Sequence, residues 1–70
     1  MSTVAASDNF RKNVREEAER RGMTHRDLAK KAKMHFVSLS RILNGKTEPS
    51  LPVAERIAKA INKSLEEILS

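Results

Sequence analysis

The chain contains no cysteine, tryptophan or tyrosine, and only two phenylalanines, two glycines and two prolines among its 70 residues. The absence of cysteine excludes a disulfide framework and a thiolate metal site, and it is typical of proteins from a reducing compartment. No apolar run approaches the roughly 20 residues that a membrane-spanning helix needs. The first residues, MSTVAAS, lack the charged and apolar segments of a signal peptide. We therefore expect a small soluble protein of the cytoplasm.

Catalytic and metal-binding patterns are missing as well. There is no glycine-rich phosphate loop, and no set of Ser, His and Asp residues that indicates nucleophilic catalysis. His25 and His35 are the two histidines, and without Cys or acidic partners they do not predict a zinc site. The carboxylates of Glu16, Glu17 and Glu19 fit a solvated helix face better than a catalytic pair. We expect no enzymatic activity, no metal, no cofactor and no small-molecule ligand.

The positive charge is concentrated between Thr24 and Lys46. The whole chain has a formal net charge of +5, and this stretch has six basic residues against a single acid, Asp27. It therefore carries the entire excess, because acidic and basic residues balance elsewhere. Scattered charge would indicate solubility alone, whereas one basic segment favours a polyanionic partner. No helix pairs a broad apolar face with a basic one, as helices at membrane surfaces do. We predict a nucleic-acid partner and no membrane partner.

Apolar spacing and helix-capping residues predict an all-α fold of five short helices, with no pattern typical of strands. Residues 1–7 are expected to form a flexible polar arm, and residues 8–70 a single domain. The first helix is expected to begin near Ser7 or Asp8. Approximate ranges for the five helices are 8–21, 24–33, 35–43, 50–62 and 64–69.

The second and third helices have the features of a helix-turn-helix. Thr24 and Asp27 form a capping box, and Met23 and Leu28 form a hydrophobic staple that fixes the entry of the chain. Ala29 is small enough for the two helices to cross closely. An ordinary pair of bundle helices can share this apolar spacing, so the spacing and the charge together favour the motif.

The third helix separates its apolar and polar residues. On a helical wheel, Leu39, Ile42 and Leu43 share one side, which predicts a core stripe. Val37 and Arg41 lie nearly opposite. Arg can pair with O6 and N7 of guanine, and an apolar side chain can pack on the methyl group of thymine. This outer face is therefore suited to reading base edges.

Four segments of the chain carry a family resemblance: MTHRDLAKKA, LSRILNGKTEPS, AERIAKAI and SLEEIL. Together they resemble the phage repressor/Cro-type, or XRE, family of helix-turn-helix domains over about residues 8–70. The resemblance implies a compact, lambda repressor-like five-helix bundle. It also implies a sequence-specific transcriptional regulator, a repressor that binds a palindromic operator in double-stranded DNA as a homodimer. Helix 35–44 is then expected in the major groove.

Site residues follow from the resemblance by position. The residues expected to read bases are Phe36, Val37, Ser38, Ser40 and Arg41. The residues expected to contact phosphate are His25, Asn44 and Lys46. The candidates for the dimer interface are Leu65, Ile68 and Leu69. Two alternatives stay open, because Phe36 can be partly structural and the three apolar residues of the last helix can simply close the core.

The sequence departs from the family pattern at three places. Lys33 stands where the family usually has Gly, so it is expected to adopt a positive φ. His35 stands where a small polar cap is usual and is a weaker cap. Leu43 and Ala18 stand where an acid and an arginine often pair, and we expect an apolar contact there instead.

Two other functions remain compatible with the sequence. The same domain can be an antitoxin that represses its own operon. A different class is a helical protein-interaction module, in which Phe36 and Val37 form the partner surface.

Overall fold

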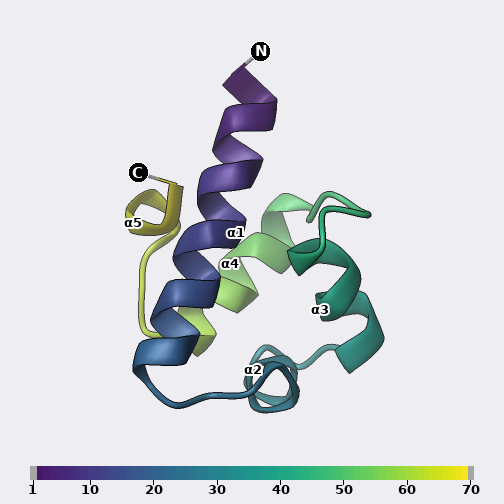
Figure 1. The fold of residues 1–70 in the computed structure, drawn as a ribbon, viewed down its shortest axis with the longest axis vertical. Helices are drawn as coiled ribbons and strands as arrows, with labels where there is room; N and C mark the ends of the chain where they lie inside the picture. Colours follow the sequence, from purple (N-terminus) through teal and green to yellow (C-terminus); the bar gives the residue numbers. More distant parts are fainter. Residues whose placement is uncertain (1, 70) are drawn as a thin grey trace.

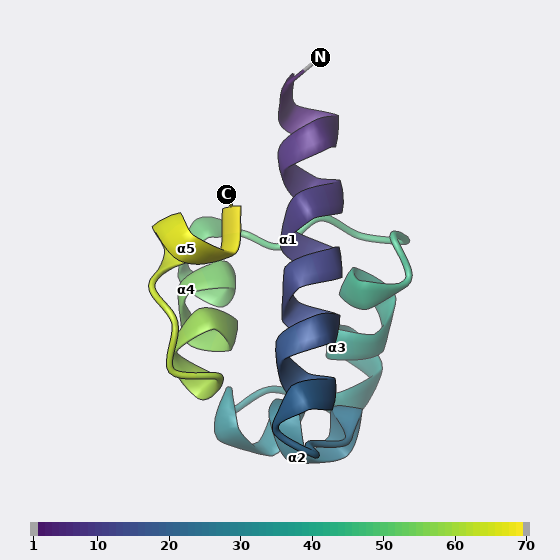
Figure 2. The same cartoon turned by 60° about the vertical axis from the view of Figure 1, so that its left-hand side comes forward.

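The computed structural model describes the backbone of residues 2–69 and the side chains from Asp8 onward. Over that part the chain forms five α-helices and no strand, which confirms the predicted all-α fold. The helices are α1 (Ser2–Arg20), α2 (His25–Lys31), α3 (Phe36–Leu43), α4 (Leu51–Ala60) and α5 (Leu65–Leu69). Two views show the long α1 standing between α5 and α3, with α2 crossing near its C-terminal end (Figures 1 and 2).

Helix α1 is longer than predicted. It begins at Ser2 instead of near Ser7 or Asp8. Asp8 does not cap the helix but accepts a hydrogen bond from Nη1 of Arg11 at 2.9 Å, inside the same helix. The first turns rise beyond the other helices (Figure 2). Met1 lies outside the described residues. That residues 1–7 are a flexible arm on a domain of residues 8–70 stays a prediction.

A single apolar core lies between the helices. The predicted stripe of α3 is confirmed, because Leu39, Ile42 and Leu43 are at most 5% exposed. Each such side chain contributes about 1.5–3 kcal/mol by leaving water. The core residues are Phe10, Val14, Ala18, Leu28, Ala29, Ala32, Leu39, Ile42, Leu43, Ala54, Ile57, Ala58, Ile61 and Ile68.

Two capping boxes fix helix starts, and the sequence predicts both, Thr24 with Asp27 and Ser64 with Glu67. The Thr24 hydroxyl accepts from the Asp27 amide and the Asp27 carboxylate accepts from the Thr24 amide, both at 3.1 Å. Ser64 and Glu67 form the same pair of bonds at the start of α5, at 3.2 and 2.9 Å. Accepting the backbone amide of the cap residue lowers the pKa of each carboxyl below its ordinary value.

The turn between α2 and α3 requires a left-handed residue, and Lys33 adopts that conformation with a φ of 58°. The prediction made from the missing glycine is therefore confirmed. A left-handed conformation costs a residue with a Cβ atom roughly 1–2 kcal/mol. The turn is thus formed at the expense of local backbone strain.

Replacing Lys33 by glycine is expected to stabilise the domain by about 0.5–1 kcal/mol, because relief of the strain exceeds the entropy that glycine adds to the unfolded chain. For a chain of this size the melting temperature should rise by about 2–8 °C, measurable by circular dichroism. Asn62→Gly is the control, since Asn62 has a similar φ of 56° and asparagine tolerates it better. An equal or larger gain for Asn62→Gly would contradict this account of strain.

Glu17 corrects the expectation of a solvated acidic face on the first helix. Its side chain is only 9% exposed, and its carboxylate accepts from Nη1 of Arg20 at 2.5 Å and from Nε of Arg21 at 2.8 Å. The hydrogen bond from Arg21 is the main cause that lowers the pKa of Glu17, with help from the charges of Arg20 and Lys63. Glu17 is therefore a structural carboxylate at the end of α1.

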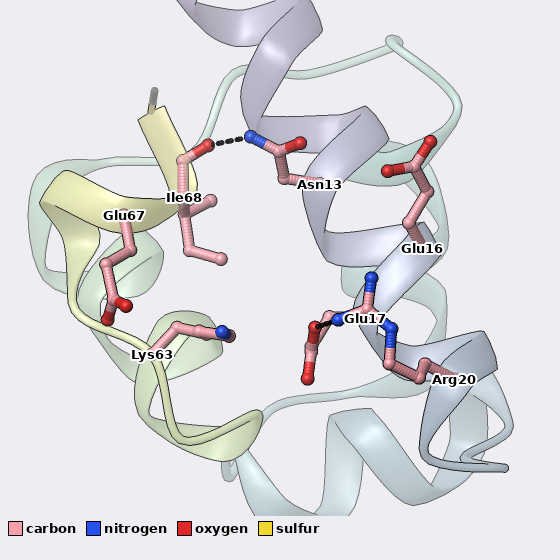
Figure 3. A pocket seen from close by; sticks show the side chains of 7 residues that line it. All are labelled: Asn13, Glu16, Glu17, Arg20, Lys63, Glu67 and Ile68. Carbon is pink, nitrogen blue, oxygen red and sulfur yellow. Dashed lines mark hydrogen bonds and ion pairs between the residues drawn. The ribbon is translucent and has the colours of Figure 1, made fainter.

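Figure 3 shows how α1 meets the C-terminal part of the chain. The Asn13 amide donates from Nδ2 to the Ile68 carbonyl at 2.5 Å, joining α1 to α5. Glu17 and Lys63 lie on opposite sides of a polar surface pocket of about 430 Å³ between these elements. Polar contacts thus reinforce the packing of the first helix against the last.

Candidate nucleic-acid interface

The outward face of α3 carries Val37, Ser38 and Arg41, and all three side chains are exposed. Val37 is 58% exposed although it is apolar. Val37 and Arg41 are four residues apart, so they lie on one side of the helix, one turn from each other. The core stripe of α3 faces the other way. The structure thus brings three predicted base-reading residues together on one accessible surface.

Phe36 and Ser40, also predicted to read bases, lie on the flanks of α3 and are partly buried. The Phe36 ring packs against the core, which supports the structural alternative for this residue. The guanidinium carbon of Arg26 lies 4.5 Å from the centre of that ring. This cation–π contact joins α2 to the start of α3. Nothing in the sequence spacing indicated Arg26 as a neighbour of Phe36.

The start of α3 lacks a side-chain cap. His35 is the N-cap residue, with an extended backbone, and its side chain makes no capping hydrogen bond. This agrees with the expectation that histidine is a weak cap. His25, predicted to contact phosphate, is the first residue of α2 and is partly exposed.

The C-terminal end of α3 presents Asn44 and Lys46, the other two predicted phosphate contacts, and both are exposed. Gly45 between them has a φ of 78°, which glycine adopts without a steric penalty. The Lys46 amide donates to the Arg41 carbonyl at 2.8 Å. The backbone that carries both side chains is therefore held in a closed helix-ending turn.

Two arginines of α1 reach the same end of α3. Arg11 donates from Nε to the Ile42 carbonyl at 2.9 Å. Arg15 donates from Nη2 to the Leu43 carbonyl and, at 3.3 Å, to the side-chain oxygen of Asn44. These bonds satisfy carbonyls that the end of a helix leaves without partners.

The two arginines also replace the ion pair that the family pattern often has between the first and third helices. Ala18 and Leu43 are both buried in the core, as expected for an apolar contact. The link from α1 to the end of α3 is made instead by Arg11 and Arg15, through backbone carbonyls. A backbone carbonyl acceptor has no side-chain signature, so neither contact could be predicted from the sequence.

The three dimer candidates differ in exposure. Ile68 is 2% exposed and belongs to the core, which favours the alternative that it closes the core, and its role as a dimer contact stays an untested prediction. Leu65 is partly buried against the core. Leu69 is 40% exposed and is accessible to a partner. The alternative that this helix closes the core therefore holds for Ile68.

Among the side chains of residues 8–69, no three His, Asp or Glu residues come together in a way that could hold a metal ion. None of the helices in the same part of the chain has the length and apolarity to cross a membrane.

The sequence matches a known protein family. A family model described as Helix-turn-helix matches residues 14–68, which is most of the chain. The matched span reaches from the middle of α1 into α5 and includes all of α2, α3 and α4. Comparison with the curated proteins and with the solved structures gave no match.

Proposed function

The chain belongs to the helix-turn-helix family, and from that premise we propose that it is a sequence-specific repressor. The family match makes it a DNA-binding transcription regulator of the XRE type. The proposal goes further: the protein acts in the cytoplasm, binds a palindromic operator in double-stranded DNA as a homodimer, and is not an enzyme.

The outward face of α3 is the observation that carries the proposal. Arg41 and Val37 are exposed on that face while the opposite face is buried. The major groove admits an α-helix, where arginine can pair with guanine and an apolar side chain can contact a thymine methyl group. Arg41 and Val37 are proposed as the main base-reading residues, with Ser38 beside them. Phe36 and Ser40 are proposed to contribute from the flanks.

Phosphate contacts are proposed on both sides of this face. Asn44 and Lys46 follow α3 on a fixed turn, and His25 begins α2. Such contacts set the register of a protein on DNA but do not read the sequence. They release counterions, which makes the affinity fall steeply with salt concentration.

The dimer is proposed to place two copies of α3 in successive major grooves, about 34 Å apart. Leu69 is the exposed apolar residue of α5, and Leu65 lies partly exposed on the same helix. These two residues are proposed to meet their counterparts in the second copy. Two-fold symmetry of the protein then matches a palindromic operator.

In vitro selection from a random duplex library, followed by salt-titrated binding to the selected and to a random duplex, tests the proposal. We expect a palindromic consensus and a steep salt dependence for both duplexes. A helical protein-interaction module would show no steep salt dependence. Selection of no consensus, with weak binding insensitive to salt, would exclude the proposed function.

Replacing Lys46 by alanine is expected to weaken binding to the selected and the random duplex by the same factor. Its charge is proposed to meet a phosphate, so the slope of log affinity against log salt should become shallower by about 0.9. Lys59, exposed on α4 and outside the proposed interface, offers the matched control Lys59→Ala. A Lys46→Ala effect confined to the selected duplex would show that Lys46 reads bases instead.

A further inference from the structure

Arg15 differs from the other arginines on α1 and the turn that follows it. Arg11 forms ion pairs with Asp8 and Glu48, each at 2.9 Å. Arg20 and Arg21 form theirs with the single carboxylate of Glu17. By contrast, the acceptors of Arg15 among the described residues are the neutral oxygens of Leu43 and Asn44. The charge of Arg15 is therefore not compensated by an ion pair.

We propose that Arg15 is a further DNA-binding residue, contributed by α1, which contacts a backbone phosphate together with Asn44. The inference rests on the proposed function and adds to it a contact from outside the helix-turn-helix. It gives a specific role to a cation that lies at the edge of α3, next to a residue already proposed to meet phosphate.

The hydrogen bonds of Arg15 leave most of its donors available. A guanidinium group has five N–H donors, and both bonds of Arg15 come from Nη2. Nε and Nη1 make no hydrogen bond to the described residues, and the side chain is exposed. Glu16 and Glu19 lie on the same helix but form no ion pair with Arg15. Nε and Nη1 point to different sides of the planar group, and each can donate a charge-assisted hydrogen bond to a phosphate oxygen.

The position of Arg15 is fixed before DNA binds. Two acceptors on another helix restrain a side chain that is otherwise flexible, so less entropy is lost when a ligand is bound. Asn44 is restrained as well, since its oxygen accepts from Arg15 and its Nδ2 donates to the Ser40 hydroxyl at 3.3 Å. One N–H of the Asn44 amide remains. Arg15 and Asn44 thus offer adjacent, oriented donors at the end of α3.

A purely structural role for Arg15 is the competing explanation. A cation near the end of a helix stabilises the terminal carbonyls and the helix dipole without any ligand. Arg15→Ala cannot separate the two roles, because it removes the charge and the cap together. Arg15→Gln removes the charge and keeps an amide donor on a side chain two atoms shorter than arginine, and its melting temperature reports any loss of the cap. Lys12→Gln removes the same charge from an exposed residue one turn earlier on α1.

The experiment measures salt-titrated binding of the wild-type chain, Arg15→Gln and Lys12→Gln to the selected and the random duplex, with melting temperatures for all three. Arg15→Gln is expected to weaken both duplexes about tenfold. Its salt slope should be about 0.9 shallower than that of the wild-type chain. Lys12→Gln should change the affinity and the slope by less than half as much.

Three other results would contradict the inference or the proposed function on which it rests. An unchanged salt slope for Arg15→Gln, with a lower melting temperature, would reduce Arg15 to a cap of α3 and overturn the inference. Equal effects for Arg15→Gln and Lys12→Gln would overturn it too. They would indicate that the positive charge of α1 attracts DNA in general, without a specific contact by Arg15. If the wild-type chain bound neither duplex in a salt-dependent manner, the proposed function itself would fail, and the contact with it.

Discussion

Replacing Arg41 by alanine is expected to lower the affinity for the selected operator by about 5- to 150-fold, which corresponds to the roughly 1–3 kcal/mol of a bidentate arginine–guanine pair. Binding to random DNA should change far less, because there the side chain supplies one charge among many. The reason is geometric: Arg41 is exposed on the face of α3 opposite the core and makes no ion pair within the described residues. The ratio of the affinity for the selected operator to that for random DNA should therefore fall strongly.

A repeated operator selection with the variant is the sharpest measurement. The selected consensus should lose its preference at one position of each half-site and keep it elsewhere. Arg56→Ala is the matched control, since Arg56 is an exposed arginine of α4 to which no DNA contact is assigned. If Arg41→Ala weakened all sequences equally, and by no more than Arg56→Ala, Arg41 would not read a base.

Replacing Leu39 by alanine is expected to cost about 2–5 kcal/mol, through lost burial and the cavity left behind. Leu39 is fully buried and sits two residues from Arg41, on the other face of α3. A domain of 70 residues has a total stability of roughly 4–10 kcal/mol. The variant should therefore be partly unfolded at physiological temperature, with a melting temperature lower by about 10–30 °C.

Thermal and urea unfolding, followed by circular dichroism, measure this loss. Leu51→Ala is the control, because Leu51 is the same residue type but 63% exposed. Its effect should stay within about 0.5 kcal/mol. A similar melting temperature for the two variants would mean that the core does not depend on α3. DNA affinity of folded Leu39→Ala should stay near that of the wild-type chain, since the side chain does not face DNA.

Local signals made much of the fold predictable from the sequence. The capping box of Thr24 and Asp27 and the left-handed turn at Lys33 depend on residues within a few positions of each other. The same holds for the core stripe of α3, which follows from helical periodicity. Residues that face away from such a stripe must face solvent, so the exposure of Val37 and Arg41 was predictable too.

Other features depend on distant contacts and could not be predicted. Arg15 meets the end of α3 through a carbonyl 28 residues away. The burial of Glu17 depends on where the C-terminal part of the chain packs, and a run of acidic residues gives no hint of it. Ile68 looked like its neighbours Leu65 and Leu69, yet tertiary packing places it alone in the core. Helix α1 begins at Ser2, although Ser7 and Asp8 both have good capping propensity.

The bond between Asn13 and the carbonyl of Ile68 has a consequence for biosynthesis. It joins residues 55 positions apart, near the two ends of the described chain. Synthesis proceeds from the N-terminus, and a contact with the last helix cannot form until that helix has been made. The segment that is proposed to read DNA is complete before then, but α1 still lacks α5, against which it packs. We expect the domain to stay incompletely folded until α5 has emerged from the ribosome, so that products truncated before α5 should not bind the proposed operator.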